Sequence, residues 1–265
     1  MAFIEGKQEQ GVVMAPLCDI YTGPIADWYD DWLSERKEDI AYYVEVFRGR
    51  SGSALELACG TGRLLLPLAQ SGVAIEGLDS APDMLAILRK KAALLGLDDI
   101  RLYEQPMQEF AIPKKFDSIF IAGGTFQLLI PYEHALACLR CAHQHLQDDG
   151  SLLIDVFVPW DDIQSGSSSS YRVVRDSTRA DGSRGIVLER FEIDIPAQVT
   201  KGIYRYEFYK DSRLADCFVK DLWVRWYWKD EFVNLLTAAG FSNVQTLTDS
   251  SLYQEWHVYV FRAHK

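Results

Sequence analysis

The stretch that decides the fold is Ala54-Leu55-Glu56-Leu57-Ala58-Cys59-Gly60-Thr61-Gly62. Its apolar first half is typical of a short buried strand, and the residues that follow Gly62 begin an amphipathic helical pattern. Glycine lets a ligand lie against the main chain, and the first N–H groups of a helix point outward without partners. A strand, a tight glycine turn and a helix N-terminus therefore predict a ligand-binding cradle at this place.

A second apolar run, from Val73 to Leu78, ends in Asp79. An acidic side chain at the tip of the second strand can accept hydrogen bonds from the two hydroxyls of a ribose. Dinucleotide-binding enzymes combine this feature with a third glycine three residues after the second, but that position is Leu65 here. No Lys-Ser or Lys-Thr pair follows the turn either, so the sequence excludes both the dinucleotide fingerprint and a phosphate-binding P-loop.

The composition narrows the class of protein. A chain of 265 residues, 48% of them apolar, suits one large domain or a domain with an insertion. The formal net charge of −11 argues against nucleic acid or an anionic membrane surface as a partner. The apolar stretches are too short to span a bilayer, and the first residues lack the apolar core of a signal peptide. The five cysteines are scattered, so we expect a cytoplasmic protein without a disulfide framework.

Two local patterns resemble metal sites without supporting one. Cys138 and Cys141 have the Cys-x-x-Cys spacing, but they lie in a helical pattern and lack a second pair of ligands, so we interpret them as packed helix residues. Asp161 and Asp162 are adjacent, with no histidine nearby, which favours solvated side chains. The sequence therefore predicts no metal.

The middle of the chain alternates between strand and helix. We expect strands at residues 54–58, 74–78, 100–103, 116–121 and 151–158, and helices at residues 61–71, 82–95 and 131–147. Short breaks between alternating strands and helices predict a parallel sheet that is covered on both faces. Ligands of such sheets bind at the carboxyl ends of the strands.

The segments on either side of this region differ from it. Residues 1–20 show no period and are interpreted as an arm, whereas residues 21–47 are helical, with Ile25, Trp28, Tyr29, Trp32 and Leu33 on one face. Residues 164–170 are rich in serine and predict a flexible stretch. Residues 171–228 contain only strand patterns, with more aromatic side chains than a small sheet needs for packing. The surplus could cover a substrate pocket or form a dimer interface.

A helix at residues 229–239 and strands at residues 241–247 and 256–262 close the chain. The predicted organisation is thus an arm with lid helices at residues 1–48, an α/β domain at residues 49–160 and 227–265, and an inserted antiparallel β subdomain at residues 161–226. The inserted subdomain is expected to act as a substrate lid, a dimer interface, or both.

Two motifs together resemble those of the class I S-adenosylmethionine-dependent methyltransferases. They are Glu56–Gly62 and the acidic motif Gly77-Leu78-Asp79-Ser80-Ala81-Pro82-Asp83-Met84-Leu85. The last helix and the two terminal strands are similar to the closing hairpin of that family. The resemblance covers residues 20–158 and 228–262. It implies an α/β fold with a doubly wound, mostly parallel seven-stranded, Rossmann-like sheet, into which the antiparallel sheet is inserted.

The resemblance also implies an activity. The expected reaction is methyl transfer from S-adenosyl-L-methionine to nitrogen or oxygen of a small molecule, which leaves S-adenosyl-L-homocysteine. The layout is similar to that of the aminosugar N-methyltransferases. The methyl group of a sulfonium is already activated, so the protein mainly has to align the reactants for in-line displacement and exclude water.

The family resemblance assigns cofactor roles to residues along the sheet edge. The glycines would hold the methionine part, the Ala58 carbonyl would accept from its ammonium group, and Asp79 would bind the ribose. Met84 is interpreted either as an adenine contact or as a core methionine. Pro106 stands where many members carry an Asp for the adenine amine, so Gln105 or Gln108 could take that place. The full set of expected cofactor residues is Tyr29, Trp32, Glu56, Ala58, Gly60, Thr61, Gly62, Arg63, Asp79, Ser80, Met84, Met107, Gln108, Ala122 and Gly123.

The segment Ala122–Leu129 follows the fourth predicted strand, where the methyl end of the cofactor should face the substrate. Gln127 is expected to orient the substrate donor, with Tyr29 and Tyr21 as further orienting groups. Aminosugar N-methyltransferases often carry a histidine near this point, and glutamine cannot replace it as a general base. Tyr132 and His257 are spare polar candidates. The expected substrate contacts are Phe126, Gln127, Tyr132, Trp160, Trp223 and Trp226.

One alternative belongs to a different class of protein, and a second keeps the methyl-transfer chemistry but changes the substrate. A protein of this fold could bind the cofactor or its product without turnover, which the replaced adenine motif and the missing base would allow. A methyltransferase could also act on RNA or protein, but the acidic total argues against RNA. The Asn-Pro-Pro-Tyr-like motif of adenine and glutamine N-methyltransferases is absent, since Ala122-Gly123-Gly124-Thr125 stands in its place.

Overall fold

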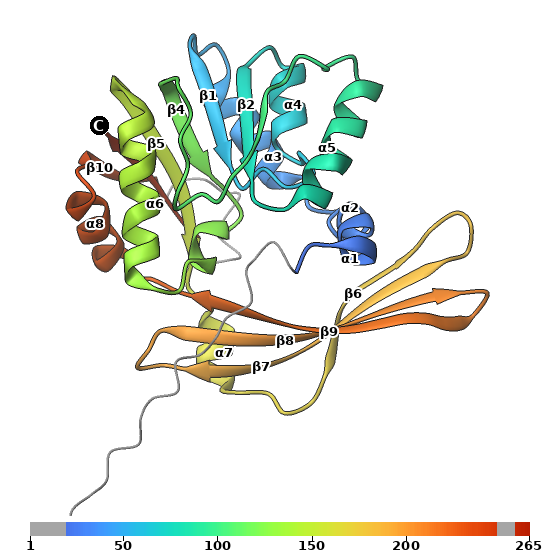
Figure 1. Ribbon diagram of the computed structural model, residues 1–265. Coiled ribbons are helices and arrows are strands. Elements are labelled where there is room, and N and C mark those ends of the chain that lie inside the picture. The colour runs from blue at the N-terminus through green and yellow to red at the C-terminus, as the bar shows by residue number, and fades with distance from the viewer. Residues whose placement is uncertain (1–19, 248–257) are drawn as a thin grey trace, which may run out of the picture.

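The computed structural model describes residues 20–247 and 258–265, which form two sheets (Figure 1). Residues 1–19 of the predicted arm, and Trp256 and His257 of the last predicted strand, lie outside the described residues. Seven strands form one sheet in the order β10-β11-β5-β4-β1-β2-β3, and four strands form the other in the order β6-β7-β8-β9.

The seven-stranded sheet is mostly parallel, as predicted. Its strands are β1 (Ser53–Leu57), β2 (Ala74–Asp79), β3 (Leu102–Glu104), β4 (Phe116–Ile121), β5 (Leu146–Phe157), β10 (Ser242–Leu247) and β11 (Val258–His264). Neighbouring strands from β3 to β5 are parallel, whereas β11 is antiparallel to both β5 and β10. In β1, all residues from Ala54 to Leu57 are buried, because helices cover both faces of the sheet.

The helices that cover the seven-stranded sheet form two layers. They are α3 (Glu38–Phe47), α4 (Leu65–Gln70), α5 (Pro82–Leu94), α6 (Tyr132–His145) and α8 (Lys229–Ala238). Apolar side chains of α6 and α8 share one core cluster with the sheet, and those of α3, α4 and α5 share another (Figure 1). Cys138 is completely buried in α6, which confirms it as a packed helix residue. The cysteines that the structure describes (Cys59, Cys138, Cys141 and Cys217) are all free.

The second sheet is antiparallel. Its strands are β6 (Arg172–Thr178), β7 (Arg184–Asp194), β8 (Val199–Lys210) and β9 (Arg213–Arg225). A short helix, α7 (Trp160–Ser165), leads into it, so Gln164 and Ser165 end a helix instead of beginning the expected flexible stretch. The sheet lies across the end of the α/β unit at which the glycine turn is found (Figure 1).

Two very short helices lie between the sheets (Figure 1). They are α1 (Gly23–Asp27) and α2 (Tyr29–Trp32), and they replace the single helical stretch expected around residues 25–33. Helices of this length have little stability of their own, so tertiary contacts determine their position. None of the helices among the described residues is long and apolar enough to cross a bilayer.

Candidate functional site

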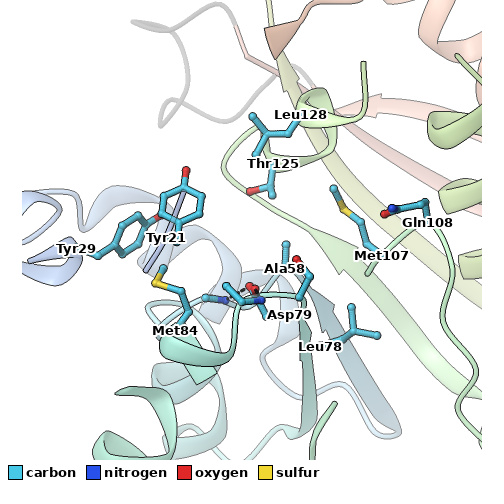
Figure 2. A pocket seen from close by; sticks show the side chains of 13 residues that line it. Tyr21, Tyr29, Ala58, Leu78, Asp79, Met84, Met107, Gln108, Thr125 and Leu128 are labelled. Atoms are coloured by element: carbon cyan, nitrogen blue, oxygen red, sulfur yellow. Dashed lines mark hydrogen bonds between the residues drawn. The ribbon is translucent and has the colours of Figure 1, made fainter. Parts of the chain in front are cut away.

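A pocket opens at the carboxyl ends of β1, β2 and β4, where parallel sheets of this type bind ligands (Figure 2). Its lining comes from residues in and before the short helices α1 and α2, from the glycine turn, from the end of β2 and the start of α5, and from the segments after β3 and β4. The lining residues are Tyr21, Tyr29, Ala58, Gly60, Leu78, Asp79, Ser80, Ala81, Met84, Met107, Gln108, Thr125 and Leu128. The structure therefore brings Tyr21 together with eight predicted cofactor residues, namely Tyr29, Ala58, Gly60, Asp79, Ser80, Met84, Met107 and Gln108.

The glycine turn has a left-handed backbone at several positions. The φ angle is +54° at Gly60, +82° at Gly62 and +58° at Ala58. A side chain rarely adopts this conformation, which costs a non-glycine residue about 1–2 kcal/mol and is concentrated at binding sites. A Cβ atom on Gly62 would lie 2.2 Å from Leu88 Cδ1, so Gly62 is required by packing. At Gly60 the nearest such contact is Met84 Cε at 3.4 Å, and Gly60 borders the pocket.

Asp79 ties the two loops of the pocket together. Its Oδ2 accepts a hydrogen bond from Gly60 N at 2.7 Å, and its Oδ1 accepts one from Ala81 N at 2.8 Å. The side chain is 9% exposed, and burial raises its pKa while the backbone N–H groups around it act in the opposite direction. Hydrogen bonds thus fix the orientation of the Asp79 side chain, which also lines the pocket, and its role in binding a ribose stays a prediction.

Glu56 is a second buried carboxylate beside the glycine turn. Its Oε2 atom is buried and has no hydrogen-bond partner among the described residues. Burial raises the pKa of Glu56 well above its usual value, although the positive charge of Arg63 opposes this effect. Glu56 does not line the pocket, so its expected role as a direct cofactor contact stays a prediction.

Two tyrosines form one wall of the pocket. The rings of Tyr21 and Tyr29 meet edge to face, with centroids 5.5 Å apart. Figure 2 shows both rings near Met84, with Met107 and Gln108 on the opposite side and Asp79 between the two groups. Burial raises the pKa of both phenols, so they remain protonated donors at neutral pH. Met84 packs with Ala26 and Ala81 in the core and also lines the pocket, and its contact with adenine stays a prediction.

Several predicted cofactor residues lie outside the pocket, because other parts of the protein already engage them. Arg63 forms two hydrogen bonds of 2.6 Å with the carboxylate of Asp39. Trp32 packs on Tyr206 and Phe208 of the four-stranded sheet, with ring centroids 5.6 and 5.9 Å away. The structure thus gives Arg63 and Trp32 other partners outside the pocket, and their roles as cofactor contacts stay predictions. Thr61, Gly62, Ala122 and Gly123 also lie outside the lining.

Gln127 requires a larger correction. The residue is completely buried, and its Nε2 donates to the carbonyl oxygens of Phe157 (2.9 Å) and Arg225 (3.1 Å). Its Oε1 accepts from Phe157 N at 2.7 Å. The amide therefore joins the end of β5 to the end of β9 and has no free group with which to orient a substrate.

The neighbours of Gln127 explain this outcome. Residues 125–128 form a 3₁₀ helix, η2 (Thr125–Leu128), in which residues three apart lie on the same side. Thr125 and Leu128 consequently line the pocket, whereas Phe126 and Gln127 point into the core. The sequence interpretation missed Thr125 and Leu128, although their spacing after Gly123-Gly124 could have indicated them.

The other expected substrate contacts also lie outside the pocket lining. Phe126 and Trp226 are completely buried, so they belong to the core. Trp223 pairs with Lys201, whose Nζ lies 5.2 Å from the ring centroid. Tyr132 begins α6 and is 45% exposed, and the Trp160 ring lies 5.4 Å from that of Trp228. None of these residues lines the described pocket. Among the described residues there is also no cluster that could hold a metal ion.

Comparisons with known proteins find methyltransferases that are similar to this chain in sequence and in fold. Residues 54–150 match the family model described as a methyltransferase domain. The dTDP-3-amino-3,6-dideoxy-alpha-D-glucopyranose N,N-dimethyltransferase of Streptomyces fradiae is 30% identical over 148 residues, which are 53% of this chain and 54% of that protein. The chain spans about half the length of the curated relatives it matches first.

Solved structures extend the likeness to both sheets. The CcbJ methyltransferase from Streptomyces caelestis superimposes with a TM-score of 0.74 at 21% identity, over 93% of this chain and 98% of that one. The sugar N-methyltransferase KedS8 from a Streptoalloteichus species gives a TM-score of 0.70 at 18% identity, over 100% of this chain and 99% of that one. At this level of identity the likeness shows the fold, and it confirms the expected class I methyltransferase architecture.

Proposed function

We propose that this class I methyltransferase chain binds S-adenosylmethionine and transfers its methyl group to a small-molecule acceptor. The observation that carries the proposal is the position of Asp79. Its carboxylate lies at the carboxyl end of β2, in contact with the glycine turn, inside a pocket walled by two tyrosines and two methionines. This arrangement suits a ribose held between an adenine site and a methionine site.

The pocket residues divide into two ends. Ala58 and Gly60 would hold the methionine part of the cofactor, and Met84 and Met107 would hold the adenine. Gln105 Oε1 already accepts from Ala111 N at 2.8 Å, whereas Gln108 lines the pocket. Gln108 is therefore the side chain that can accept from the adenine amine in place of the aspartate missing at Pro106. The bound cofactor supplies a methyl group on a positively charged sulfur.

The acceptor atom that fits best is an amine nitrogen. None of the described lining residues is a histidine, and burial keeps the phenols of Tyr21 and Tyr29 protonated. A hydroxyl acceptor needs a base, but an amine that arrives neutral can attack without one. We therefore infer an amino group as acceptor, and an amino sugar as its carrier. The S. fradiae relative is named as an N,N-dimethyltransferase of a dTDP-linked amino sugar and KedS8 as a sugar N-methyltransferase, and both names support this choice.

The test is transfer of isotope-labelled methyl groups from S-adenosylmethionine to a panel of free amino sugars, nucleotide-linked amino sugars, simple phenols and sugars without an amine. The expected result is label on nitrogen of an amino sugar and none on the amine-free members. Transfer to phenols only would contradict the amine assignment. Cofactor binding without transfer to any member would favour the non-catalytic alternative. The Asp79→Asn variant, which lacks the charge of the ribose site, serves as the inactive control.

We also infer a homodimer that forms through the outer face of the four-stranded sheet. Four residues are paired with one another across the four strands and therefore share one face of the sheet, namely Val173, Leu188, Arg205 and Val219. Tyr206 and Phe208 lie on the other face, which packs against Trp28 and Trp32. Val173 and Val219 are 59% and 57% exposed, so the outer face presents apolar side chains that a second copy could cover. The free cysteines are compatible with a cytoplasmic location.

A further inference from the structure

Two consecutive carboxylates of α2 hold different parts of the protein. Asp30 Oδ1 accepts from Thr61 Oγ1 of the glycine turn at 2.6 Å, and its Oδ2 forms an ion pair with Lys91 of α5 at 2.7 Å. Asp31 Oδ2 accepts from Arg179 at 2.7 Å, in the turn between β6 and β7. The helix that begins with Tyr29 is thus attached to the seven-stranded unit through one residue and to the four-stranded sheet through the next.

Arg179 makes the larger share of the contacts on the sheet side. Besides Asp31, its guanidinium donates to the carboxylate of Asp27 at 2.7 Å and to the Asp27 carbonyl oxygen at 2.6 Å. The same group lies 3.9 Å from the ring centroid of Trp28. One planar cation therefore contacts α1, α2 and the residue between them, in a geometry that lysine cannot reproduce.

Other contacts hold the β6–β7 hairpin, residues 172–194, against the same helices. Ser177 Oγ donates to the Asp31 carbonyl oxygen at 3.2 Å, and Trp32 Nε1 donates to the Gly185 carbonyl oxygen at 3.3 Å. A Cβ atom on Gly185 would lie 2.7 Å from the Trp28 ring, so the close approach depends on this glycine. The hairpin and the two short helices form one packed unit.

This packed unit determines the position of the pocket wall that Tyr21 and Tyr29 form. Helix α2 has four residues, which is too short to be stable by itself. Tyr29 is its first residue and lines the pocket together with Tyr21, although neither of them contacts Arg179 in the hydrogen bonds above. The tyrosine wall consequently depends on contacts that come from a strand turn about 150 residues later in the chain.

We propose that Arg179 is a positioning residue for the cofactor pocket, which holds Tyr29 and Tyr21 in place through Asp27, Asp31 and Trp28 and so couples the four-stranded sheet to cofactor binding. The proposal rests on the proposed function, because the ligand in question is S-adenosylmethionine or its product. Loss of Arg179 would leave every lining side chain intact but would require the bound ligand to order the wall, which weakens binding.

The test is calorimetric titration of the full chain with S-adenosylhomocysteine. We expect Arg179→Gln to raise the Kd about tenfold and Arg179→Lys to restore part of the loss. The matched control is Arg184→Gln, since Arg184 lies in the same hairpin but pairs with Asp176 and not with α1 or α2. An equal Kd for Arg179→Gln and the wild type would overturn the proposal, even if the variant melts at a lower temperature.

Coupling must act in both directions, which gives a second readout. Addition of S-adenosylhomocysteine to the wild type should slow backbone hydrogen exchange in the β6–β7 turn, residues 177–185, and Asp31→Asn should abolish this protection. Unchanged exchange in the wild type, with binding confirmed in the same sample, would overturn the coupling. Absence of binding to the wild type would instead contradict the proposed function, so the two failures are distinguishable.

Discussion

The two sheets of this protein are specified in different ways. The central strands β1 and β2 of the seven-stranded sheet are parallel and almost entirely buried, and the pocket edge of this sheet is built from residues at or directly after the ends of these strands, such as Gly60 and Asp79. The four-stranded sheet has strands of up to 13 residues, and many side chains of its edge strands are exposed. In the seven-stranded sheet, the pocket residues lie in short sequence motifs next to the strands. The four-stranded sheet reaches the pocket only indirectly, through contacts between residues that are far apart in the sequence.

Substitutions in the two sheets should therefore have different effects. A substitution at the carboxyl edge of the parallel sheet should change ligand affinity directly. A substitution in the antiparallel sheet or at its junction should change affinity only where its contacts reach the pocket wall, and otherwise should change stability or association.

Asp79→Ala should have the largest effect on cofactor affinity. Each charge-assisted hydrogen bond contributes about 1.5–3 kcal/mol, so loss of the carboxylate should cost about 3 kcal/mol, roughly a hundredfold in Kd for S-adenosylhomocysteine. Equilibrium dialysis measures the ratio. Asp117→Ala is the matched control, because Asp117 accepts from Ser53 N at 2.6 Å at the opposite end of β1. Equal losses in the two variants would remove Asp79 from the ribose role.

Gln127→Ala should act on stability at the junction of the sheets. The substitution removes the three buried hydrogen bonds that Gln127 makes with the backbone of Phe157 and Arg225, so the free energy of unfolding should fall by about 2 kcal/mol. Urea denaturation measures this change. Gln108→Ala is the contrasting variant, with affinity reduced several-fold and stability unchanged. A Gln127→Ala protein of normal stability that binds S-adenosylhomocysteine but does not turn over would restore the substrate role.

Glu56→Gln should stabilise the protein in a pH-dependent way. Burial raises the folded-state pKa of Glu56, so its contribution to stability is full below the unfolded-state pKa and is lost as the pH rises through the folded-state pKa. Glutamine lacks this titration. The variant should therefore unfold at a higher denaturant concentration than the wild type above the folded-state pKa, and the difference should shrink towards acidic pH. A difference that grows on acidification would show that Glu56 is ionised and paired in the folded protein.

Val219→Asp should have the smallest effect on the pocket. The side chain is 57% exposed on the outer face of the four-stranded sheet, and a charge there should disrupt association without changing the Kd for S-adenosylhomocysteine. Sedimentation equilibrium should show a dimer for the wild type and a monomer for the variant. A wild-type monomer would exclude the inferred interface.

The sequence predicts the parts of the site that are local. The strand, the glycine turn and Asp79 follow from a pattern within 26 residues, because all parallel strands end at one edge. It does not predict the partners of Trp32 or Arg179, whose contacts lie 153 and 148 residues away. Gln127 shows the same limit. A polar side chain after the fourth strand suggested a group that orients the substrate, but the 3₁₀ turn of η2 directs this side chain into the core.

Calorimetric titration of the wild-type chain with S-adenosylmethionine and S-adenosylhomocysteine, with NAD as the control ligand, would show whether the pocket beside the glycine turn binds the methyl-transfer cofactor. The assignment of this cofactor to the pocket predicts one site per chain with micromolar affinity for the first two ligands, and no heat of binding for NAD, because Leu65 stands where the dinucleotide fingerprint needs a glycine. Binding of NAD in preference to both, or no binding of either methyl-transfer ligand in the presence and absence of an amino-sugar pool, would contradict it.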